Sequence, residues 1–310
     1  MLLMFPGQGS QAAGMGMDVY DAFPSARDVF HSVDDALSQK LSHLIFHGDE
    51  GELKKTSNAQ PALMAVSMAL ATVLRDEFGV DVGKIATFFA GHSLGEYSAL
   101  CAAGVISIPE AAKVLRIRGR AMAEACPSGG SMAAIVGLTS EDVENILPEC
   151  CGDGQIVQLA NDNSPLQVVV SGHREAVEKV MEKSLKSNAK MAKMLEVSGP
   201  FHSILMEEAV APVAEALEEM NFRNPVRPVI ANVTARAEIG NFRELLLKQL
   251  TERVRWRESM AFAAAHSISA CVEIGAGRVL SGLAKKISSD WDVTTVNSLE
   301  TLEKFAKTCC

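Results

Sequence analysis

The sequence predicts an α/β protein whose main domain carries an inserted subdomain. Apolar runs typical of strands alternate with helical periods along all 310 residues, and 48% of the residues are hydrophobic. Six elements in the middle of the chain also follow the order β, α, β, β, α, β. A chain of this length can therefore build one large α/β core, with a smaller unit inserted into it.

The N-terminal part is expected to open with a strand at residues 1–7, because it lacks the basic region of a secretory signal. A turn-rich loop follows at 5–11, and its glycines do not form the G-x-G-x-x-G pattern of a dinucleotide site. Helices are expected at roughly 22–40, 61–78 and 108–126. The last of these is expected to end near Pro127, Ser128 and the two glycines that follow.

A strand, a turn and a helix surround Ser93. Residues 85–90 form an apolar run, and residues 96–104 read as a helix that ends at a glycine. Between them, residues 91–95 read GHSLG, in which the flanking glycines permit a sharp turn that exposes the serine Oγ. This context predicts a nucleophile elbow with Ser93 as the nucleophile. An ordinary glycine-rich turn is the alternative.

Residues 129–198 are expected to form the insert, which leaves residues 1–128 and 199–310 for the main domain. Strands at 132–136, 156–161, 167–171 and 192–197 are interleaved with helices at 140–147 and 174–187. This βαββαβ order is typical of a ferredoxin-like subdomain. After it, a helix is expected at about 203–220 and short strands at 229–232 and 270–274, with further helices between and after them.

Charge and cysteine content argue against several classes of protein. A formal net charge of −9 disfavours a nucleic-acid binder held by general electrostatics. The seven cysteines are odd in number and show no C-x-x-C spacing, so we expect no disulfide framework, no metal site and a cytoplasmic location. No segment is expected to be apolar enough, over a sufficient length, to span a membrane. Cys309 and Cys310 lack the polybasic segment that would favour lipid attachment.

A serine nucleophile needs a base, and His202 is the candidate among seven histidines. His92 adjoins Ser93, but consecutive residues in a tight turn point in different directions. His202 lies in a loop where the chain returns from the insert, and loops beside a rigid scaffold often carry catalytic groups. A structural histidine is the alternative, and only a pairing with Ser93 favours the catalytic role.

Arg118 is predicted to face the protein interior. In the helix at 108–126, the residues three and four positions away are Val114, Leu115, Ala121 and Met122, so this face is apolar. A guanidinium cannot lose its proton there and therefore needs an anion. An internal carboxylate would satisfy it, and so would a substrate carboxylate bound by two parallel hydrogen bonds.

Two backbone N–H groups are expected to stabilise an oxyanion. The N–H of Leu94 directly follows the nucleophile at a helix N-terminus. A second N–H has to come from another loop, and the Gly-Gln-Gly loop around Gln8 is a plausible source. A turn that binds no ligand is the alternative for this loop.

Six short runs occur in the order in which one enzyme family carries them. They are FPGQGSQ at 5–11, QPA at 60–62, GHSLGEY at 91–97, RG at 118–119, NSP at 163–165 and GPFHS at 199–203. Together they resemble the malonyl-CoA:acyl carrier protein transacylases, over the length from the first strand to residue 280. The chain departs from the family pattern at Ala276, where proline is common, and at Leu166, where glycine is commoner. Both departures affect loops rather than the proposed catalytic atoms.

The resemblance implies an α/β-hydrolase-like core with a parallel sheet, a ferredoxin-like insert and a Ser93–His202 dyad. It assigns the third catalytic role to the backbone carbonyl of Gln249, which would fix the tautomer of His202. It assigns the oxyanion hole to Gln8 and Leu94, and the substrate carboxylate to Arg118. The further residues implied to line or support the substrate site are Gln60, Asn163, Phe201 and Met122. A bulky Phe201 resembles the malonyl-selective form of the family, since its ring leaves little room for an α-methyl group.

The activity implied by the resemblance is ping-pong transfer of malonyl from malonyl-CoA to the phosphopantetheine thiol of acyl carrier protein, in fatty acid biosynthesis. No cofactor is expected, since the carrier brings the phosphopantetheine, and the expected state is a monomer. Alternatives are a serine esterase or thioesterase, a malonyl transferase subunit of a larger assembly, and a non-catalytic scaffold. The lysines at 190, 193, 285 and 286 are candidates for contacting an acidic carrier.

Overall fold

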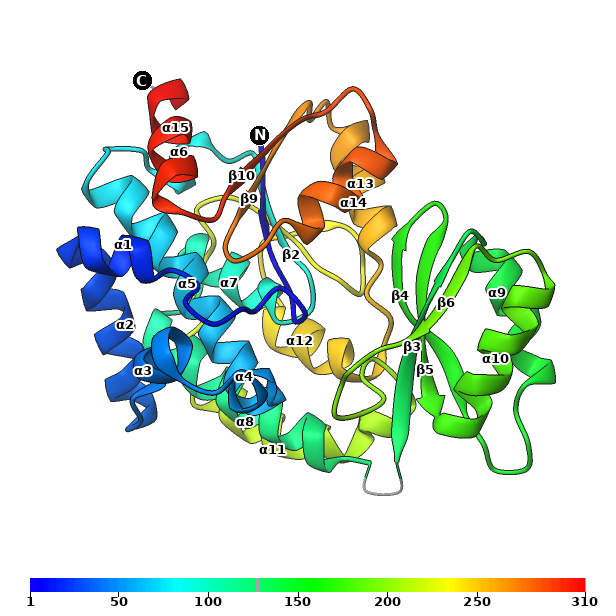
Figure 1. Cartoon of the computed structure of the whole chain (residues 1–310). Coiled ribbons are helices and arrows are strands. Elements are labelled where there is room, and N and C mark those ends of the chain that lie inside the picture. The colour runs from blue at the N-terminus through cyan, green and yellow to red at the C-terminus, as the bar shows by residue number, and fades with distance from the viewer. Residues whose placement is uncertain (127–128, 310) are drawn as a thin grey trace.

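The computed structural model describes residues 1–126 and 129–309, and it contains two separate β-sheets (Figure 1). The larger sheet has the strand order β10-β9-β1-β2-β7-β8, and the smaller has the order β4-β5-β3-β6. The predicted α/β fold with a second, smaller sheet is therefore confirmed. The predicted helix stop at Pro127 and Ser128, and the terminal Cys310, lie outside the described residues.

The larger sheet is parallel except for its edge strand β8, which runs antiparallel to β7. Its strands are β1 (Leu2–Phe5), β2 (Phe88–Gly91), β7 (Val229–Ile230), β8 (Ala237–Glu238), β9 (Ala270–Ile274) and β10 (Asp292–Val296). Phe5 pairs with Gly91 at the carboxyl ends of β1 and β2. Because these two strands are parallel neighbours, the loops that follow them open side by side at one edge of the sheet.

Helices cover both faces of this sheet, as the alternation of side chains along β1 shows. Leu3 and Phe5 belong to the core cluster that includes α5 and α7, whereas Leu2 and Met4 pack in the cluster with α13 and α14. The helices of this part of the chain are α1 (Met17–Ala22), α2 (Pro24–Leu37), α3 (Leu41–His47), α4 (Glu50–Lys54), α5 (Thr56–Asp76), α6 (Val82–Ile85), α7 (Gly95–Ala102), α8 (Ile108–Glu124), η2 (Ile204–Ala209, a 3₁₀ helix), α11 (Val210–Glu218), α12 (Phe242–Thr251), α13 (Trp256–Ala265), α14 (Val279–Ile287) and α15 (Leu299–Cys309).

Helix α5 corrects two predictions. It begins at Thr56 rather than at Pro61, so the proline lies inside the helix, where its missing N–H removes one backbone hydrogen bond. By length and composition alone, α5 is also apolar enough to cross a membrane, so the expectation that no segment has this character was wrong. Within the fold, 89% of its apolar window is buried, which is the position of a core helix.

Two other segments differ from the prediction. The strand expected from residue 85 begins only at Phe88, because Asp81 caps a short helix: its side chain accepts a hydrogen bond from the N–H of Gly83, at 2.9 Å. The helix expected at 203–220 starts as the 3₁₀ helix η2 and continues as α11.

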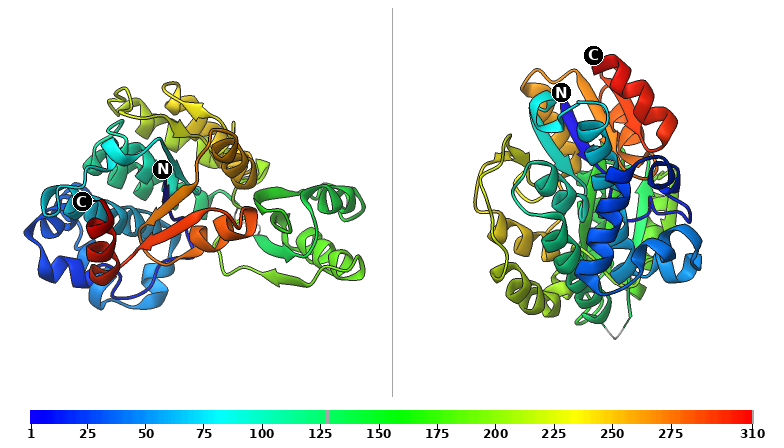
Figure 2. Two further views of the ribbon diagram at one scale, coloured as in Figure 1. Left: turned by 90° about the horizontal axis from the view of Figure 1, so that it is seen from above. Right: turned by 90° about the vertical axis from the view of Figure 1, so that its left-hand side faces the viewer.

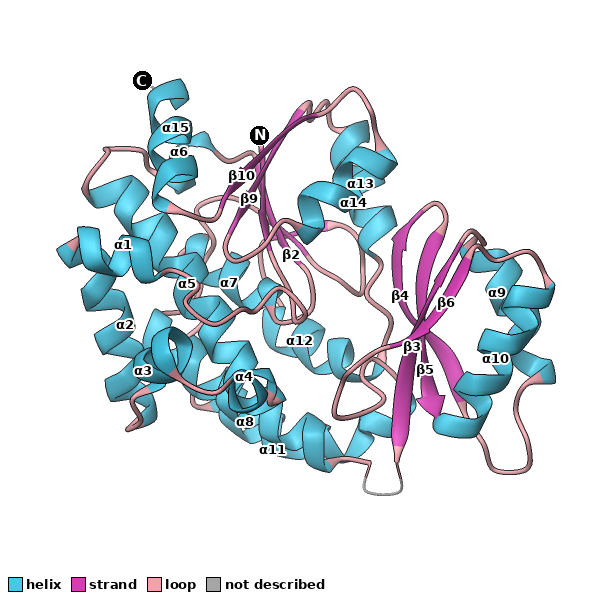
Figure 3. Ribbon diagram, in the orientation of Figure 1, coloured by secondary structure: helices cyan, strands magenta, loops and turns pink. Residues whose placement is uncertain are grey.

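The smaller sheet is antiparallel, and its elements follow the predicted βαββαβ order (Figure 3). They are β3 (Gly130–Val136), α9 (Ser140–Ile146), η1 (Leu147–Glu149, a 3₁₀ helix), β4 (Val157–Ser164), β5 (Gln167–His173), α10 (Arg174–Lys186) and β6 (Met191–Met194). Val143 of α9 and Val180 of α10 pack on one face of this sheet. Met132 and Val169, on the other face, join the core of the larger unit.

The insert lies to one side of the larger unit, as the view from above shows most clearly (Figure 2). Backbone hydrogen bonds join the two parts, from the N–H of Val254 to the carbonyl of Ala160 at 2.8 Å and from the N–H of Asp162 to the carbonyl of Val254 at 2.9 Å. Strand β4 is thereby tied to the segment that precedes α13.

Candidate active site

Ser93 occupies a sharp turn between β2 and α7, with a φ of 53° that non-glycine residues rarely adopt. A Cβ at Gly91 would lie 1.9 Å from the carbonyl oxygen of Gly95, and one at Gly95 would lie 2.2 Å from that of Phe5. Only glycine fits at either position. The turn therefore has the geometry of a nucleophile elbow, with the serine side chain raised above the sheet.

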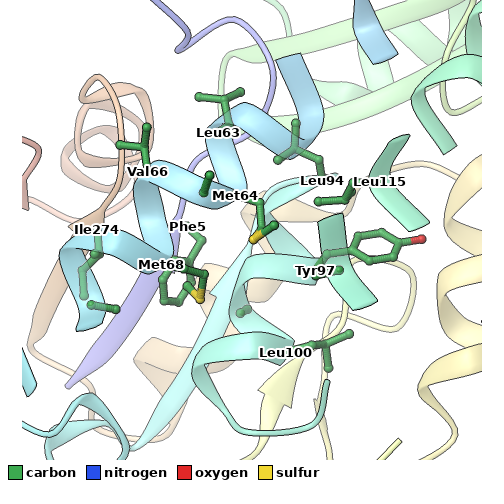
Figure 4. Packing of buried hydrophobic residues seen from close by; sticks show 14 of the residues in the cluster. Phe5, Leu63, Met64, Val66, Met68, Leu94, Tyr97, Leu100, Leu115 and Ile274 are labelled. Atoms are coloured by element: carbon green, nitrogen blue, oxygen red, sulfur yellow. The ribbon is translucent and has the colours of Figure 1, made fainter. Parts of the chain in front are cut away.

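The helix after the turn is fixed by packing. Leu94 and Tyr97 contribute to a buried cluster with Leu63 and Met64 of α5 and Leu115 of α8 (Figure 4). All five side chains are almost completely buried. The elbow is thus built on rigid elements rather than on a free loop, which fixes the position of Ser93.

Ser93 pairs with His202, as the sequence predicted. Ser93 Oγ lies 2.8 Å from His202 Nε2, and His202 Nδ1 lies 2.7 Å from the backbone carbonyl oxygen of Gln249. A carbonyl only accepts hydrogen bonds, so Nδ1 carries the proton and Nε2 is left free to accept the serine proton. The three groups form a dyad with a carbonyl in the third place.

The surroundings of His202 keep its imidazole neutral. The ring is buried, and burial lowers the pKa of His202 to about 3, with a further contribution from the positive charge of Arg118. A neutral imidazole is the form that can remove a proton from Ser93.

Arg118 lies on α8 with a completely buried side chain, and it points at the nucleophile. Its Nη2 donates to Ser93 Oγ at 3.1 Å and to Gln249 Oε1 at 2.9 Å, and its Nη1 donates to Gln60 Oε1 at 2.7 Å. Within the part of the chain that the structure describes, its Nε has no hydrogen-bond partner. Among the described residues, no carboxylate forms a salt bridge with Arg118. Of the two anions left open by the sequence, the internal one is therefore not in contact with the guanidinium.

The two N–H groups expected to form an oxyanion hole belong to adjacent loops. A Cβ at Gly7 would lie 2.6 Å from the carbonyl oxygen of His92, so the loop of Gln8 touches the elbow. Within the described chain, the backbone N–H groups of Gln8 and Leu94 donate to no protein acceptor. Both donors are therefore available to a ligand beside Ser93.

A cavity of about 450 Å³ opens over Ser93. The predicted residues that line it are Gln8, Gln60, Ser93, Arg118, Met122, Phe201 and His202. The insert forms part of its wall through residues 193–197, and Lys54 and Lys193 bring positive charge to it. Among the described residues, no group of three or more His, Cys, Asp or Glu side chains is placed to hold a metal.

Asn163 supports the elbow rather than lining the cavity. Its Oδ1 accepts a hydrogen bond from His92 Nε2 at 2.8 Å, and the other side of the His92 ring packs on Trp256 with ring centroids 5.6 Å apart. His92 therefore ties the elbow to strand β4.

Three buried polar side chains behind the site were not predicted to act there. Asn232 Oδ1 accepts from the N–H of Ser93 at 2.8 Å, and Gln249 Nε2 donates to the carbonyl of Ser93 at 3.0 Å and to Glu96 Oε2 at 2.7 Å. Burial raises the pKa of Glu96 to about 7. In the sequence, Glu96 could have been noticed as a single acidic residue followed by an almost wholly apolar helix.

Comparison with known proteins identifies the family. The model of the acyl transferase domain matches residues 2–304. The chain belongs to this acyl transferase family. It is 43% identical to the malonyl CoA-acyl carrier protein transacylase of Bacillus subtilis (strain 168), over 98% of this chain and 96% of that protein. The resemblance seen in the sequence runs is thereby confirmed.

Solved structures of acyl transferases have the same fold. The acyl-carrier-protein-S-malonyltransferase of Bartonella henselae superposes with a TM-score of 0.95 at 46% identity, covering 99% of this chain and 98% of that one. A malonyl-transacylase in complex with its type II PKS acyl-carrier protein superposes with a TM-score of 0.94 at 40% identity, covering 99% of each chain. Both cover the larger unit and the insert together.

Proposed function

We propose that this acyl transferase moves a malonyl group from malonyl-CoA to the phosphopantetheine thiol of acyl carrier protein, for fatty acid biosynthesis. The observation that carries the proposal is the buried guanidinium of Arg118, whose Nη2 lies 3.1 Å from Ser93 Oγ and which forms no salt bridge with any acid of the described residues. An acyl group on Ser93 that ends in a carboxylate would supply the missing anion. An acetyl group would leave the guanidinium without one.

In the first half-reaction, Ser93 gives its proton to His202 Nε2 while Oγ forms a bond to the thioester carbonyl carbon. The N–H groups of Gln8 and Leu94 would donate to the oxygen that becomes negative. Collapse of this intermediate breaks the carbon–sulfur bond, and His202 returns the proton to the leaving CoA sulfur. The product is a malonyl ester on Ser93.

The second half-reaction runs the same steps with a different thiol. His202 removes the proton from the phosphopantetheine thiol, and the sulfur attacks the ester carbonyl. The carbon–Oγ bond then breaks and the proton passes from His202 to Ser93 Oγ. No resident cofactor or metal takes part in this scheme, since the carrier itself brings the phosphopantetheine.

Acyl carrier protein is the proposed partner, and the same complex between a carrier and a transacylase is known for the neighbour described above. Lys54 and Lys193 at the cavity, and Lys190 three residues before Lys193, suit an acidic carrier. A monomeric, cytoplasmic enzyme remains our expectation.

A serine thioesterase is the competing activity, because the same elbow and oxyanion hole serve hydrolysis. The two are separated by measuring free CoA, free malonate and malonyl-carrier after addition of malonyl-CoA with and without phosphopantetheinylated carrier. Transfer predicts malonyl-carrier in amounts equal to the CoA released. Release of equal amounts of malonate and CoA without carrier would favour the hydrolase.

A further inference from the structure

A buried chain of hydrogen bonds runs from the active-site guanidinium to Glu96, a residue to which the proposed mechanism gives no role. Arg118 Nη2 donates to Gln249 Oε1 at 2.9 Å, and Gln249 Nε2 donates to Glu96 Oε2 at 2.7 Å. The exposed fractions of the three side chains are 0%, 0% and 1%, so water does not compete for these contacts.

The order of donors and acceptors fixes the direction of the Gln249 amide. A guanidinium only donates hydrogen bonds, and Glu96 Oε2 accepts from both Gln249 Nε2 and the N–H of Asn232. The oxygen of the amide must therefore face Arg118 and its nitrogen must face Glu96. If the amide turned over, it would place a donor against Arg118 and an acceptor against Glu96, and each such buried mismatch is costly.

Gln249 also serves the other catalytic group. Its backbone carbonyl accepts from His202 Nδ1 at 2.7 Å, while its side-chain amide holds Arg118. Glu96 Oε2 further accepts from the backbone N–H of Asn232 at 3.1 Å, and Asn232 in turn accepts from the N–H of Ser93. One buried carboxylate thus anchors the supports of all three catalytic side chains.

The amide between the two charges has a second consequence. A carboxylate in direct contact with Arg118 would take up the guanidinium N–H groups that a substrate carboxylate needs. With Gln249 between them, ionised Glu96 still lowers the electrostatic cost of burying Arg118, while the N–H that Arg118 directs at Ser93 Oγ is not taken up by a carboxylate. This separation distinguishes the arrangement from an ordinary buried salt bridge.

We infer that Glu96 is a positioning residue for carboxylate capture: through Gln249 it holds the Arg118 guanidinium in the orientation that receives the malonyl carboxylate. This inference rests on the proposed function. If it holds, Glu96 affects the preference for malonyl over acetyl groups in the loading of Ser93, and not only the stability of the elbow.

The variant Glu96→Gln tests this role with little change in volume. The new amide can still offer one acceptor oxygen to Gln249, but it lacks the negative charge and adds an N–H₂ group that needs its own acceptor, which weakens the support of the Gln249 amide. We expect kcat/KM for malonylation of Ser93 to fall about tenfold to a hundredfold, since misplacement by ~1 Å has effects of this size. Acetylation, which does not use the carboxylate site, should change by less than about threefold.

The matched control is Glu238→Gln. Glu238 is the other acid whose charge acts on Glu96, but the structure shows no hydrogen bond between Glu238 and Gln249. Its removal tests whether a lost negative charge alone changes the selectivity, and we expect the ratio of malonyl to acetyl loading to stay at the wild-type value. An equal loss of selectivity in both variants would overturn the inference.

A second variant covers the case in which Glu96→Gln does not fold. The double variant Glu96→Gln, Gln249→Glu keeps a donor and an acceptor facing each other between the two positions, but it puts a carboxylate directly on Arg118 and removes the donor to the Ser93 carbonyl. Where it folds, we expect residual acetylation of Ser93 with no malonyl preference. Recovery of the malonyl preference would contradict the inference, and failure of both variants to fold would assign Glu96 to folding alone.

Wild-type protein in the same assay separates the two proposals. If it showed no preference for malonyl over acetyl loading, the proposed function would fail, and the role of Glu96 with it. If wild type prefers malonyl and Glu96→Gln loses malonyl and acetyl loading in equal proportion, only the role of Glu96 is overturned.

Discussion

Ser93 Oγ contacts both His202, the proposed base, and Arg118, the proposed carboxylate-binding residue. It donates to His202 Nε2 at 2.8 Å and accepts from Arg118 Nη2 at 3.1 Å. The histidine can take the proton, and the guanidinium stabilises the oxygen that is left behind. Once Oγ is acylated, the N–H that Arg118 directs at this oxygen can donate to the acyl group instead.

Arg118→Ala is expected to reduce malonyl transfer by about a hundredfold or more, because a desolvated carboxylate would lose its paired charge. Acetyl transfer should fall much less. The ratio of kcat/KM values for malonyl-CoA and acetyl-CoA measures this effect. Arg120→Ala on the same helix is the control, since its side chain is 77% exposed and should leave the ratio unchanged. Equal losses for both substrates in Arg118→Ala would refute carboxylate recognition.

The pH dependence of acylation follows from the lowered pKa of His202. Since its pKa in the folded protein is about 3 and its ordinary value is 6.5, the ring stays neutral, and active, as the pH falls well below 6.5. We expect the acid limb of kcat/KM for acetylation of Ser93 to lie below pH 6. In Arg118→Gln this limb should move to higher pH, because a neighbouring positive charge is gone. A limb at pH 6.5 in both proteins would contradict the assignment.

The sequence alone predicts the roles of some residues of the site and not those of others. Ser93 was predictable from its local motif, and the burial of Arg118 from helical spacing. The contact between Gln249 and Glu96 joins residues 153 positions apart, and no local pattern encodes it. The apolar neighbours of Glu96 indicate that it is buried, but nothing near it in the sequence indicates that Gln249 is its hydrogen-bond partner.

At the scale of elements, the elbow depends on how closely α7 approaches β1. A Cβ at Gly95 would lie 2.2 Å from the carbonyl oxygen of Phe5 and 2.8 Å from that of Pro6, both rigid backbone atoms. The parallel pairing of β1 with β2 brings these segments together. A single methyl group at this point would therefore push the helix away from the sheet.

Gly95→Ala is expected to destabilise the protein by about 2–3 kcal/mol, or to prevent folding, because overpacking of this kind forces the backbone to shift. Gly282→Ala is the matched control. It lies in α14, a Cβ there meets nothing within 4 Å, and the change should stabilise by about 0.5–1 kcal/mol. Denaturant unfolding of the two variants measures both effects. A Gly95→Ala protein as stable as wild type would show that the approach is not tight.

The helices and strands that were predicted best have a regular alternation of apolar and polar residues and clear capping or turn residues at their ends. The six main elements of the insert lie within a few residues of their expected positions, since each has a regular pattern and a turn at its ends. Only Ile85, the last residue of the short helix α6, was assigned to the strand, and the cap from Asp81 that starts this helix was not predicted. The two-residue strands β7 and β8 are held mainly by tertiary contacts, and β8 has no signal of its own.

At the scale of the whole molecule, the catalytic cavity depends on how the insert is held against the larger unit. Arg257 of α13 donates to both carboxylate oxygens of Asp162 on β4, at 2.7–3.0 Å. The Asp162 side chain is only 1% exposed. The Oδ1 of Asn163, the next residue, accepts from His92 of the elbow at 2.8 Å, so this junction reaches the nucleophile within a few residues.

Arg257→Ala should cost about 3 kcal/mol of stability, because it leaves a buried carboxylate unpaired. It should also raise the KM for malonyl-CoA, since the insert forms one wall of the cavity. Thermal unfolding and steady-state kinetics measure these effects. Arg174→Ala, which removes an exposed pair with Glu178, is the control and should have little effect. No change in either measurement for Arg257→Ala would mean that this ion pair does not hold the insert.

The relative position of the two parts was beyond prediction from the sequence. Sequence patterns show which residues face a core, but not that Met132 and Val169 of the insert share a core with the larger unit. That placement arises from contacts between segments about 90 residues apart, such as that of Val254 with Ala160.

The most direct test of the account is the intact mass of the wild-type protein and of Ser93→Ala after mixing with malonyl-CoA, before and after addition of phosphopantetheinylated acyl carrier protein. We predict one malonyl adduct on the wild type, none on Ser93→Ala, and quantitative movement of the adduct to the carrier. An adduct that persists on Ser93→Ala, or one that decays to malonate at the same rate with and without carrier, would contradict transfer through Ser93.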